Sequence, residues 1–319
     1  MPTTYSTKML ILGSGPAGLS AAIYGARAGL APIVVQGIQP GGQLTTTTDV
    51  ENYPGFADVI QGPWLMEQMQ AQAEHVGTRM MWDMVSAVDL SRRPFRLIGD
   101  GGDIYEGDTL VIATGAQAKW LGLSSEDALK GKGVSACATC DGFFYRGKKV
   151  AVIGGGNTAV EEALYLTNHS PDVTLIHRRD HLRAERILQD RLFAHPNITV
   201  LWNKRVGRFV GEEGRGLVAL DLIDTATGEE TQLGVDGAFV AIGHHPATEL
   251  FRDTPLRLDD EGYIAVETGS TRTNIEGVFA CGDVQDKVYR QAVTAAGTGC
   301  MAALDAERFL AAHEFAVAA

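Results

Sequence analysis

The sequence lacks the features of disordered, coiled-coil and membrane proteins. It has 319 residues, of which 45% are hydrophobic and 21% charged, a balance that is typical of a folded protein rather than a disordered or coiled-coil one. It has no long hydrophobic run near its start, because the first apolar stretch, Met9 to Leu12, is far shorter than a signal sequence or a membrane span. We therefore expect a cytoplasmic protein that does not bind a membrane.

Positive charge is also scarce. Lys and Arg together number 27 against 39 Asp and Glu, which gives a formal net charge of -12. A surface with this excess of negative charge repels a polyphosphate backbone. Nucleic acid is therefore not an expected partner.

Cysteine is too rare for a disulfide scaffold. The chain has four cysteines, and only Cys137 and Cys140 lie close together in sequence. Neither a second CxxC nor a set of spaced histidines accompanies them, so we expect no metal site, and a lone CxxC in a cytosolic chain favours redox chemistry. Cys281 and Cys300 are expected to be packed thiols without a catalytic role.

One strand, turn and helix pattern occurs twice in the sequence. Lys8 to Leu12 is an apolar run that leads into the glycine-rich stretch from Gly13 to Gly18, and small residues with helical spacing follow. Lys149 to Ile153 and the glycines that begin at Gly154 repeat this pattern a domain's length later. We therefore predict an α/β protein with two Rossmann-like, three-layer domains, each of which binds a nucleotide.

Two further apolar strands mark the points where the chain passes from one domain to the other. Thr109 to Ala113 and Ala238 to Ile242 are both followed closely by a glycine. We predict that residues 1–117 and 246–319 form the first domain together, and that residues 118–245 are inserted between them as the second domain.

Each glycine turn suits the pyrophosphate of a dinucleotide. Glycine has no Cβ to block the turn, the ligand or the helix packing, so the backbone amides at the helix N-terminus can approach the phosphates. An acid that binds ribose often ends the second strand, but Gln36 and His177 stand at that position, so no acidic ribose contact is expected. The candidate residues are Gly13, Ser14, Gly15, Pro16, Ala17 and Gly18 in the first turn and Gly154, Gly156, Asn157 and Thr158 in the second.

Basic residues follow the second strand of the inserted unit, at the position that sets cofactor specificity. They are His177, Arg178, Arg179 and Arg183. Guanidinium groups bind a 2′-phosphate through paired hydrogen bonds, whereas a carboxylate would repel it. A solvated basic face is the plainer interpretation of a charge run, but the location of this one favours NADPH over NADH.

The CxxC pair has the composition of a redox centre. Cys137 and Cys140 are close enough for a disulfide, and a helix N-terminus beside them would lower the pKa of one thiol. Asp141 follows directly, and its carboxyl group can donate the proton that a leaving thiolate needs. The plainer alternatives are a buried unreactive thiol pair and a capping aspartate. Phe143 and Phe144 are either core residues or anchors for a docking protein.

A further acid follows an apolar strand near the end of the sequence. Gly277 to Ala280 leads through Cys281 into Gly282 and Asp283. An acid at the end of such a strand can bind a sugar hydroxyl, so Asp283 is a candidate cofactor ligand.

Taken together, these residues resemble the low-molecular-weight, bacterial-type thioredoxin reductases, which belong to class II of the pyridine nucleotide-disulfide oxidoreductases. The resemblance runs through nearly the whole chain. It is carried by the segments Gly13–Gly18, Gly41–Leu44, Val50–Gly55, Ala113–Gly115, Cys137–Asp141, Gly154–Glu162, His177–Arg183, Cys281–Val284 and Arg290–Ala292.

The resemblance implies a flavoprotein enzyme, a thioredoxin-disulfide reductase that acts in cell redox homeostasis. It implies FAD in the first domain, NADPH in the inserted domain, thioredoxin as the protein substrate and a cytoplasmic homodimer. Cys140 would face the flavin and Cys137 would attack the partner, and Arg178, Arg179 and Arg183 would hold the 2′-phosphate. The FAD ligands that it implies besides the first turn are Gly42, Gln43, Leu44, Asn52, Ala113, Thr114, Gly115, Gly282, Asp283, Arg290, Gln291 and Ala292.

Two other functions remain open from the residues alone. A flavin enzyme that reduces ferredoxin or flavodoxin would use the same two nucleotide sites but has no need of a CxxC beside an acid. A flavin-containing redox sensor would oxidise its dithiol without turnover. In the reductase, the nicotinamide site and the cysteines of the inserted domain must both reach one flavin, so we hypothesise that this domain rotates about residues 115–118 and 243–247.

Overall fold

The structure is a computed structural model that describes residues 2–46 and 49–318, with side chains as far as residue 313. The chain divides into two compact units. Unit 1 consists of Met1–Gln117 and His245–Ala319, and unit 2 consists of Ala118–His244. The strands β9 (Ala116–Ala118) and β18 (His244–Pro246) pair with each other where the chain passes between the units.

Unit 1 is built on a sheet with the strand order β5-β2-β1-β8-β7-β6. β1 is parallel to β2 and to β8, whereas β7 pairs antiparallel with the first half of β8 and β19 pairs parallel with its second half. The carboxyl ends of β1, β8 and β19 therefore lie side by side. The strands are β1 (Thr4–Leu12), β2 (Ile33–Val35), β5 (Arg79–Met81), β6 (Val85–Asp89), β7 (Phe95–Gly99), β8 (Ile104–Ile112) and β19 (Val278–Ala280).

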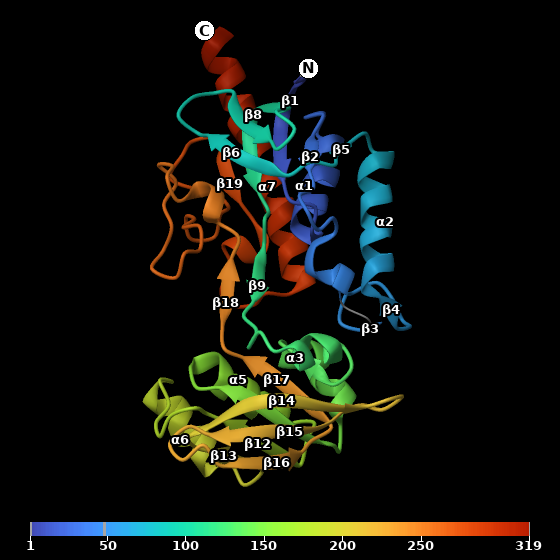
Figure 1. Ribbon diagram of the computed structural model, residues 1–319. Helices are drawn as coiled ribbons and strands as arrows, with labels where there is room; N and C mark the ends of the chain where they lie inside the picture. The colour runs from blue at the N-terminus through green and yellow to red at the C-terminus, as the bar shows by residue number, and fades with distance from the viewer. Residues whose placement is uncertain (1, 47–48, 319) are drawn as a thin grey trace. The chain divides into compact units, whose positions relative to one another are not determined.

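Small residues allow the helices α1 and α7 to pack closely on one face of this sheet (Figure 1). Alternate residues of β1 explain the layering: Met9 and Ile11 contact the helices, whereas Leu10 and Leu12 face a second core around Phe251. The helices of unit 1 are α1 (Pro16–Arg27), α2 (Gly62–His75) and α7 (Ala292–Ala318), with short 3-10 turns η1 (Gly42–Thr46), η3 (Glu249–Phe251) and η4 (Gly282–Val284) and a small hairpin of β3 (Asp49–Val50) and β4 (Ile60–Gln61).

Unit 2 has a five-stranded parallel sheet with the order β10-β17-β11-β12-β13 and a separate antiparallel sheet with the order β14-β15-β16. Val150 and Val152 of β11 pack on the helical side, and Ala151 and Ile153 pack toward the antiparallel sheet. The strands are β10 (Val134–Ser135), β11 (Lys149–Gly154), β12 (Asp172–Ile176), β13 (Ile198–Leu201), β14 (Lys204–Glu212), β15 (Gly216–Asp224), β16 (Glu230–Gly234) and β17 (Gly237–Ala241), and the helices are α3 (Ser124–Leu129), α4 (Ala138–Asp141), α5 (Asn157–Leu166) and α6 (Arg186–Ala194), with the 3-10 turn η2 (Gly142–Tyr145).

Both predicted strand, turn and helix patterns are present, and the α/β class is confirmed. The first strand begins earlier than predicted, at Thr4 instead of Lys8, because its polar first half pairs with β8 along an exposed part of the sheet. The first helix also begins earlier, at Pro16, since proline has no amide hydrogen to lose and is tolerated at the first helical position.

The first glycine turn needs the absence of a side chain at two positions. Gly13 has a φ of 106°, in the region that favours glycine. A Cβ on Gly18 would collide with the carbonyl group of Gly13 and lie 3.4 Å from the Cβ of Ala113. Gly15, which caps α1, has no heavy atom within 4 Å of an added Cβ. The fold therefore requires glycine at positions 13 and 18 and leaves open space above Gly15.

We predict that Gly18→Ala destabilises the ligand-free protein and that Gly15→Ala, its matched control, does not. The added methyl group at position 18 must displace backbone, which costs about 1–3 kcal/mol, whereas the same group at position 15 enters open space and changes the free energy of unfolding by less than about 1 kcal/mol. Urea unfolding of the two variants and the wild type measures the difference. Equal destabilisation by both substitutions would contradict this account of the turn.

Candidate functional site

Cys137 and Cys140 form a disulfide at the start of α4. Their Cα atoms lie 5.3 Å apart. Cys137 is the N-cap of this short helix, and its Sγ accepts a hydrogen bond from the backbone amide of Cys140 at 3.2 Å. An amide that points at a sulfur stabilises the thiolate that forms when the disulfide is reduced. The local structure is therefore suited to a reactive Cys137.

Asp141 lies at the end of the same turn. It is half-buried, and its backbone amide donates to the carbonyl oxygen of Cys137 at 3.1 Å. Burial raises the pKa of the Asp141 carboxyl above its usual range, and a hydrogen bond from Ser135 opposes this change. Burial together with the charge of Asp141 raises the pKa of Tyr145 to about 12. The raised pKa makes Asp141 a better proton donor near neutral pH than an exposed aspartate.

Ser135 and Tyr145 also belong to this site, although neither was a predicted site residue. Ser135 ends β10, and its Oγ accepts a hydrogen bond from the backbone amide of Cys137 at 3.1 Å. Tyr145 packs edge-on against Phe239 of β17. The Tyr145 contact has no signal in the sequence, because it joins η2 to a strand that lies far later in the chain, whereas the Ser135 contact is local and a serine two residues before Cys137 could have indicated it.

The two phenylalanines after the disulfide are exposed rather than part of the core. Phe143 has a relative exposure of 48% and Phe144 of 36%, and the guanidinium of Arg146 lies 4.7 Å from the ring centre of Phe143. Exposed aromatic rings beside a cation are typical of protein-binding surfaces. Core packing, the plainer interpretation of these residues, is wrong.

The first glycine turn is in contact with the loop at the start of η1. The backbone amide of Gly41 donates to the Oγ of Ser14 at 3.1 Å. A Cβ on Gly42 would lie 3.3 Å from the Cα of Gly15. Leu44 packs against the core of unit 1, whereas Gln43 is exposed. The structure thus brings together two segments that are separated by more than a helix and a strand in sequence.

The ends of β8 and β19 complete this group. A Cβ on Gly13 would lie 3.2 Å from the backbone nitrogen of Thr114, whose Oγ1 donates to the carbonyl oxygen of Ala247 at 2.7 Å. A Cβ on Gly282 would lie 2.8 Å from the Cβ of Ala17. The predicted residues Ala113, Thr114 and Gly282 therefore lie around the same turn, and Gly115 follows Thr114 in sequence.

One buried and one half-buried polar side chain in unit 1 indicate a ligand that the chain itself does not supply. Gln36, directly after β2, is 3% exposed, and neither its Oε1 nor its Nε2 has a hydrogen-bond partner among the described residues. Asp283 follows β19, and burial raises the pKa of its carboxyl to about 7, with Asp286 adding to the effect and Arg290 opposing it. A buried amide such as that of Gln36 is normally hydrogen-bonded. A dinucleotide with ribose and ribityl hydroxyl groups fits the open turn and these two side chains.

The remaining predicted residues of unit 1 are less closely tied to the turn. Arg290 has a φ of 48°, and Gln291 donates from its side chain to the carbonyl oxygens of Tyr289 and Arg290 at 3.2 and 3.1 Å, directly before α7 begins at Ala292. Asn52 is exposed in the loop after β3, and within the described part of the chain no hydrogen bond joins it to the turn. Asn52 is therefore the predicted ligand that the structure of this unit supports least.

The second glycine turn lies between β11 and α5 and resembles the first. Gly156 caps α5, Asn157 and Thr158 begin the helix, and no heavy atom lies within 4 Å of an added Cβ on Gly156. A Cβ on Gly154 would lie 3.1 Å from the carbonyl carbon of Ala241. The open position and the tight position thus have the same order as in the first turn, which fits a second pyrophosphate.

The basic cluster of unit 2 divides into one buried and three exposed residues. Arg178, Arg179 and Arg183 are exposed, and none of them is in an ion pair among residues 2–46 and 49–313. His177 is 6% exposed, and its Nδ1 lies 2.8 Å from the carbonyl oxygen of Gly154. Burial lowers the pKa of His177, with the charges of Arg179 and Arg178 adding to the effect and the carbonyl groups of Gly154 and His181 opposing it. Three arginines are therefore available to an anionic ligand.

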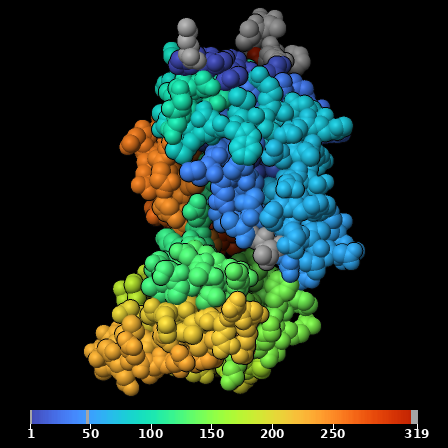
Figure 2. All heavy atoms as spheres, turned by 45° about the vertical axis from the view of Figure 1, so that its right-hand side comes forward, coloured from blue at the N-terminus to red at the C-terminus, as the bar shows by residue number. Residues whose placement is uncertain are grey.

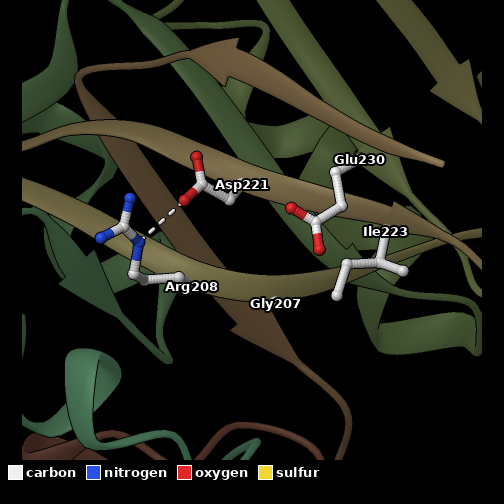
Figure 3. A pocket seen from close by; sticks show the side chains of 5 residues that line it. All are labelled: Gly207, Arg208, Asp221, Ile223 and Glu230. Atoms are coloured by element: carbon white, nitrogen blue, oxygen red, sulfur yellow. Dashed lines mark hydrogen bonds and ion pairs between the residues drawn. The ribbon is translucent and has the colours of Figure 1, made fainter. Parts of the chain in front are cut away.

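A shallow cavity of about 290 Å³ lies on the antiparallel sheet of unit 2, whose yellow and orange atoms form part of the surface in Figure 2. Gly207, Arg208, Asp221, Ile223 and Glu230 line it, and Figure 3 shows Arg208 and Asp221 facing each other. This ion pair has an N to O distance of 2.8 Å. No residue of the predicted nucleotide or redox sites lines this cavity.

Two kinds of site are absent from the described residues. No group of three or more His, Cys, Asp or Glu side chains there could hold a metal ion. No helix there is both long enough and apolar enough to cross a membrane.

The two cysteines outside the disulfide are free thiols, and Cys281 is fully buried, which raises the pKa of its thiol to about 12. Cys300 is only half-buried, so the expectation that it is a packed thiol is met only in part.

Comparison with known proteins places this arrangement in a family. The family model described as pyridine nucleotide-disulphide oxidoreductase matches residues 7–299. The chain is 59% identical over 306 residues to a thioredoxin reductase of Rickettsia conorii, which covers 96% of this chain and 98% of that protein. It is 55% identical over 318 residues to a thioredoxin reductase of Escherichia coli O157:H7, with 97% and 98% covered.

Solved structures agree with the sequence relatives. The structure of thioredoxin reductase from Giardia duodenalis matches with a TM-score of 0.92 and 40% sequence identity, and the match covers 96% of this chain and 99% of that one. On the evidence of the two nucleotide-binding folds, the CxxC disulfide and these matches, the chain belongs to the pyridine nucleotide-disulphide oxidoreductase family and, within it, to the low-molecular-weight thioredoxin reductases.

Proposed function

We propose that the chain is an NADPH-dependent thioredoxin-disulfide reductase that passes electrons from NADPH through FAD to the Cys137–Cys140 disulfide and then to oxidised thioredoxin. The observation that carries this proposal is the Cys137–Cys140 disulfide, which lies at the start of a helix beside an acid with a raised pKa. The names of the relatives, thioredoxin reductase, support thioredoxin as the substrate. We propose a cytoplasmic homodimer, as the family resemblance implies.

Unit 1 is the proposed FAD site. The open space above Gly15 and the buried, unpartnered amide of Gln36 support this assignment. When bound, FAD supplies two-electron transfer between a pyridine nucleotide and a disulfide. The first turn would bind the pyrophosphate through backbone amides, and Asp283 would bind a hydroxyl group of the ribityl chain. The other proposed ligands are Gly42, Gln43, Leu44, Asn52, Ala113, Thr114, Gly115, Gly282, Arg290, Gln291 and Ala292.

Unit 2 is the proposed NADPH site. Its glycine turn, Gly154 to Thr158, would bind the pyrophosphate, and Arg178, Arg179 and Arg183 would bind the 2′-phosphate. Three exposed guanidinium groups without an ion pair among the described residues support this assignment, because arginine binds phosphate through paired hydrogen bonds. No acid follows β12 directly to repel the 2′-phosphate.

The dithiol chemistry can be assigned to individual groups. Two electrons supplied by the bound flavin would break the Cys137–Cys140 bond, and uptake of one proton would leave Cys137 as a thiolate and Cys140 as a thiol. The Cys137 thiolate, which the Cys140 amide stabilises, attacks the thioredoxin disulfide and expels one thioredoxin thiolate, which takes a proton from Asp141. The Cys140 thiol then gives its proton to the Asp141 carboxylate and attacks the Sγ of Cys137, which re-forms the disulfide and releases the second thioredoxin sulfur as a thiolate.

Steady-state turnover tests this proposal directly. With no other electron acceptor added, we expect the flavin-loaded wild type to oxidise NADPH continuously only when thioredoxin is present, and Cys140→Ser to lose this thioredoxin-dependent activity by about 1,000-fold or more. NADPH oxidation with ferricyanide should persist in the variant, because that acceptor does not need the dithiol. Cys300→Ser is the matched control and should retain thioredoxin reduction. A rate of NADPH oxidation that neither depends on thioredoxin nor falls in Cys140→Ser would mean that the enzyme has another acceptor.

The raised pKa of Asp141 gives a pH dependence with a definite sign. Since the acid form donates the proton, wild-type thioredoxin reduction should slow as the pH rises through this raised pKa. Asp141→Asn should be about 100-fold slower and should not show this decline, while its ferricyanide activity stays at the wild-type level. The kcat values over the whole pH range in which the protein stays folded measure both effects, with Asp127→Asn as an exposed control. An Asp141→Asn profile that matches the wild type would exclude this role.

A further inference from the structure

Four hydrogen bonds join the second glycine turn, residues 154–157, to the arginine segment, residues 177–185. His177 Nδ1 lies 2.8 Å from the carbonyl oxygen of Gly154. The backbone amide of Arg183 donates to the carbonyl oxygen of Gly155 at 2.7 Å. The Oδ1 of Asn157 accepts from the backbone amide of Glu185 at 2.8 Å, and its Nδ2 donates to Glu185 Oε1 at 3.3 Å. The two segments are therefore held together at both ends.

His177 is placed to support the turn rather than to contact a phosphate. Because a carbonyl oxygen can only accept, Nδ1 must carry the hydrogen of the bond to Gly154. The ring lies directly under Gly155, where a Cβ would be 2.8 Å from Nε2, and Trp202 packs edge-on against it with the ring centres 6.3 Å apart. His177 is 6% exposed, whereas Arg178, Arg179 and Arg183 are exposed. The phosphate-binding charge therefore comes from the arginines.

The same position in unit 1 shows that this bond is not a general requirement of the fold. Gln36 follows β2 as His177 follows β12, and both lie at the same distance in sequence from the first glycine of their turn. Yet the side chain of Gln36 makes no hydrogen bond within the described residues. The contact between strand end and turn is specific to the unit with the arginine segment.

We infer that His177 and Asn157 are positioning residues that determine the affinity for NADPH by fixing the pyrophosphate amides at a set position relative to the 2′-phosphate arginines. This inference rests on the proposed NADPH site. A ligand that binds both groups gains from their alignment, since the second contact then needs no further ordering of the chain. A ligand that reaches only one of the two groups gains nothing from it.

Binding of the unreactive oxidised nucleotides tests this inference. The probes are NADP⁺, which reaches both groups, NAD⁺, which has no 2′-phosphate, and 2′-AMP, which has no pyrophosphate. We expect His177→Phe, which keeps a ring but has no N–H, to weaken NADP⁺ binding about tenfold and binding of the other two less than twofold. The Km for NADPH should rise about tenfold while kcat with thioredoxin at saturating NADPH stays unchanged.

Three further variants make the test specific. Asn157→Ala, at an exposed position, should reproduce the selective loss of NADP⁺ affinity even where His177→Phe folds poorly. His177→Asn, whose amide can donate near the position of Nδ1, should restore most of the affinity. His181→Phe is the matched control, because this histidine of the same segment has a 70% exposed side chain, and it should bind all three probes as the wild type does.

The contrary outcomes are distinct. An equal loss of 2′-AMP and NADP⁺ affinity in His177→Phe would make His177 a direct phosphate ligand and overturn the inference. Unchanged NADP⁺ affinity in both His177→Phe and Asn157→Ala would overturn it as well. A wild type that does not prefer NADP⁺ to NAD⁺ would contradict the proposed function itself.

Discussion

Direct contact between backbone segments, with no side chain in between, is the constraint on which both nucleotide sites depend. In unit 1 the Gly18 position touches the carbonyl group of Gly13, and the Gly299 position on α7 lies against the backbone of Ala17. These approaches bring α1 against the ends of β1 and β8 and place its N-terminus beside Gly282. In unit 2 the Gly154 position lies against Ala241 in the same way. In each turn the first glycine is needed because backbone packs directly against backbone. A second glycine two residues later, Gly15 or Gly156, has no heavy atom within 4 Å of an added Cβ, so a ligand has room to bind there.

The redox centre depends on a different feature, the change in solvent exposure along one short segment. Its cysteines are partly exposed, whereas the carboxyl group of Asp141 is covered enough for its pKa to rise. Cys137 caps a helix of only four residues, so its sulfur receives one amide hydrogen bond while the pair stays partly accessible. Asp141 lies one turn later, at the end of this helix. The exposed Phe143 and Phe144 begin immediately after it. One short segment thus carries a nucleophile, an acid and an apolar surface in sequence order, which a reductase with a protein substrate requires.

Local features of the structure could be predicted from the sequence, and features that depend on packing could not. The glycine turns and the strands and helices around them follow from apolar runs and from glycine chemistry within about 20 residues. The antiparallel sheet β14–β16 was not predicted. The contact of Asn157 with Glu185 was not predicted, because it joins segments whose distance is set by the folded sheet. The contact of Ser135 with Cys137 is local, at two residues' separation, and was not predicted because the residues before the CxxC were not considered as part of the site. The sequence shows that Gln36 stands where an acid is usual. Only the structure shows that its amide is buried without a hydrogen-bond partner, so that a ligand at this position would supply one.

The central claim is that the Cys137–Cys140 disulfide exchanges electrons with a bound flavin, and the number of electrons that the protein takes up tests it most directly. Anaerobic titration of the flavin-loaded protein with dithionite should consume four electrons per flavin in the wild type, two for the flavin and two for the disulfide. Cys137→Ser and Cys140→Ser should each consume two. A wild type that is fully reduced by two electrons, with its disulfide intact, would contradict the account.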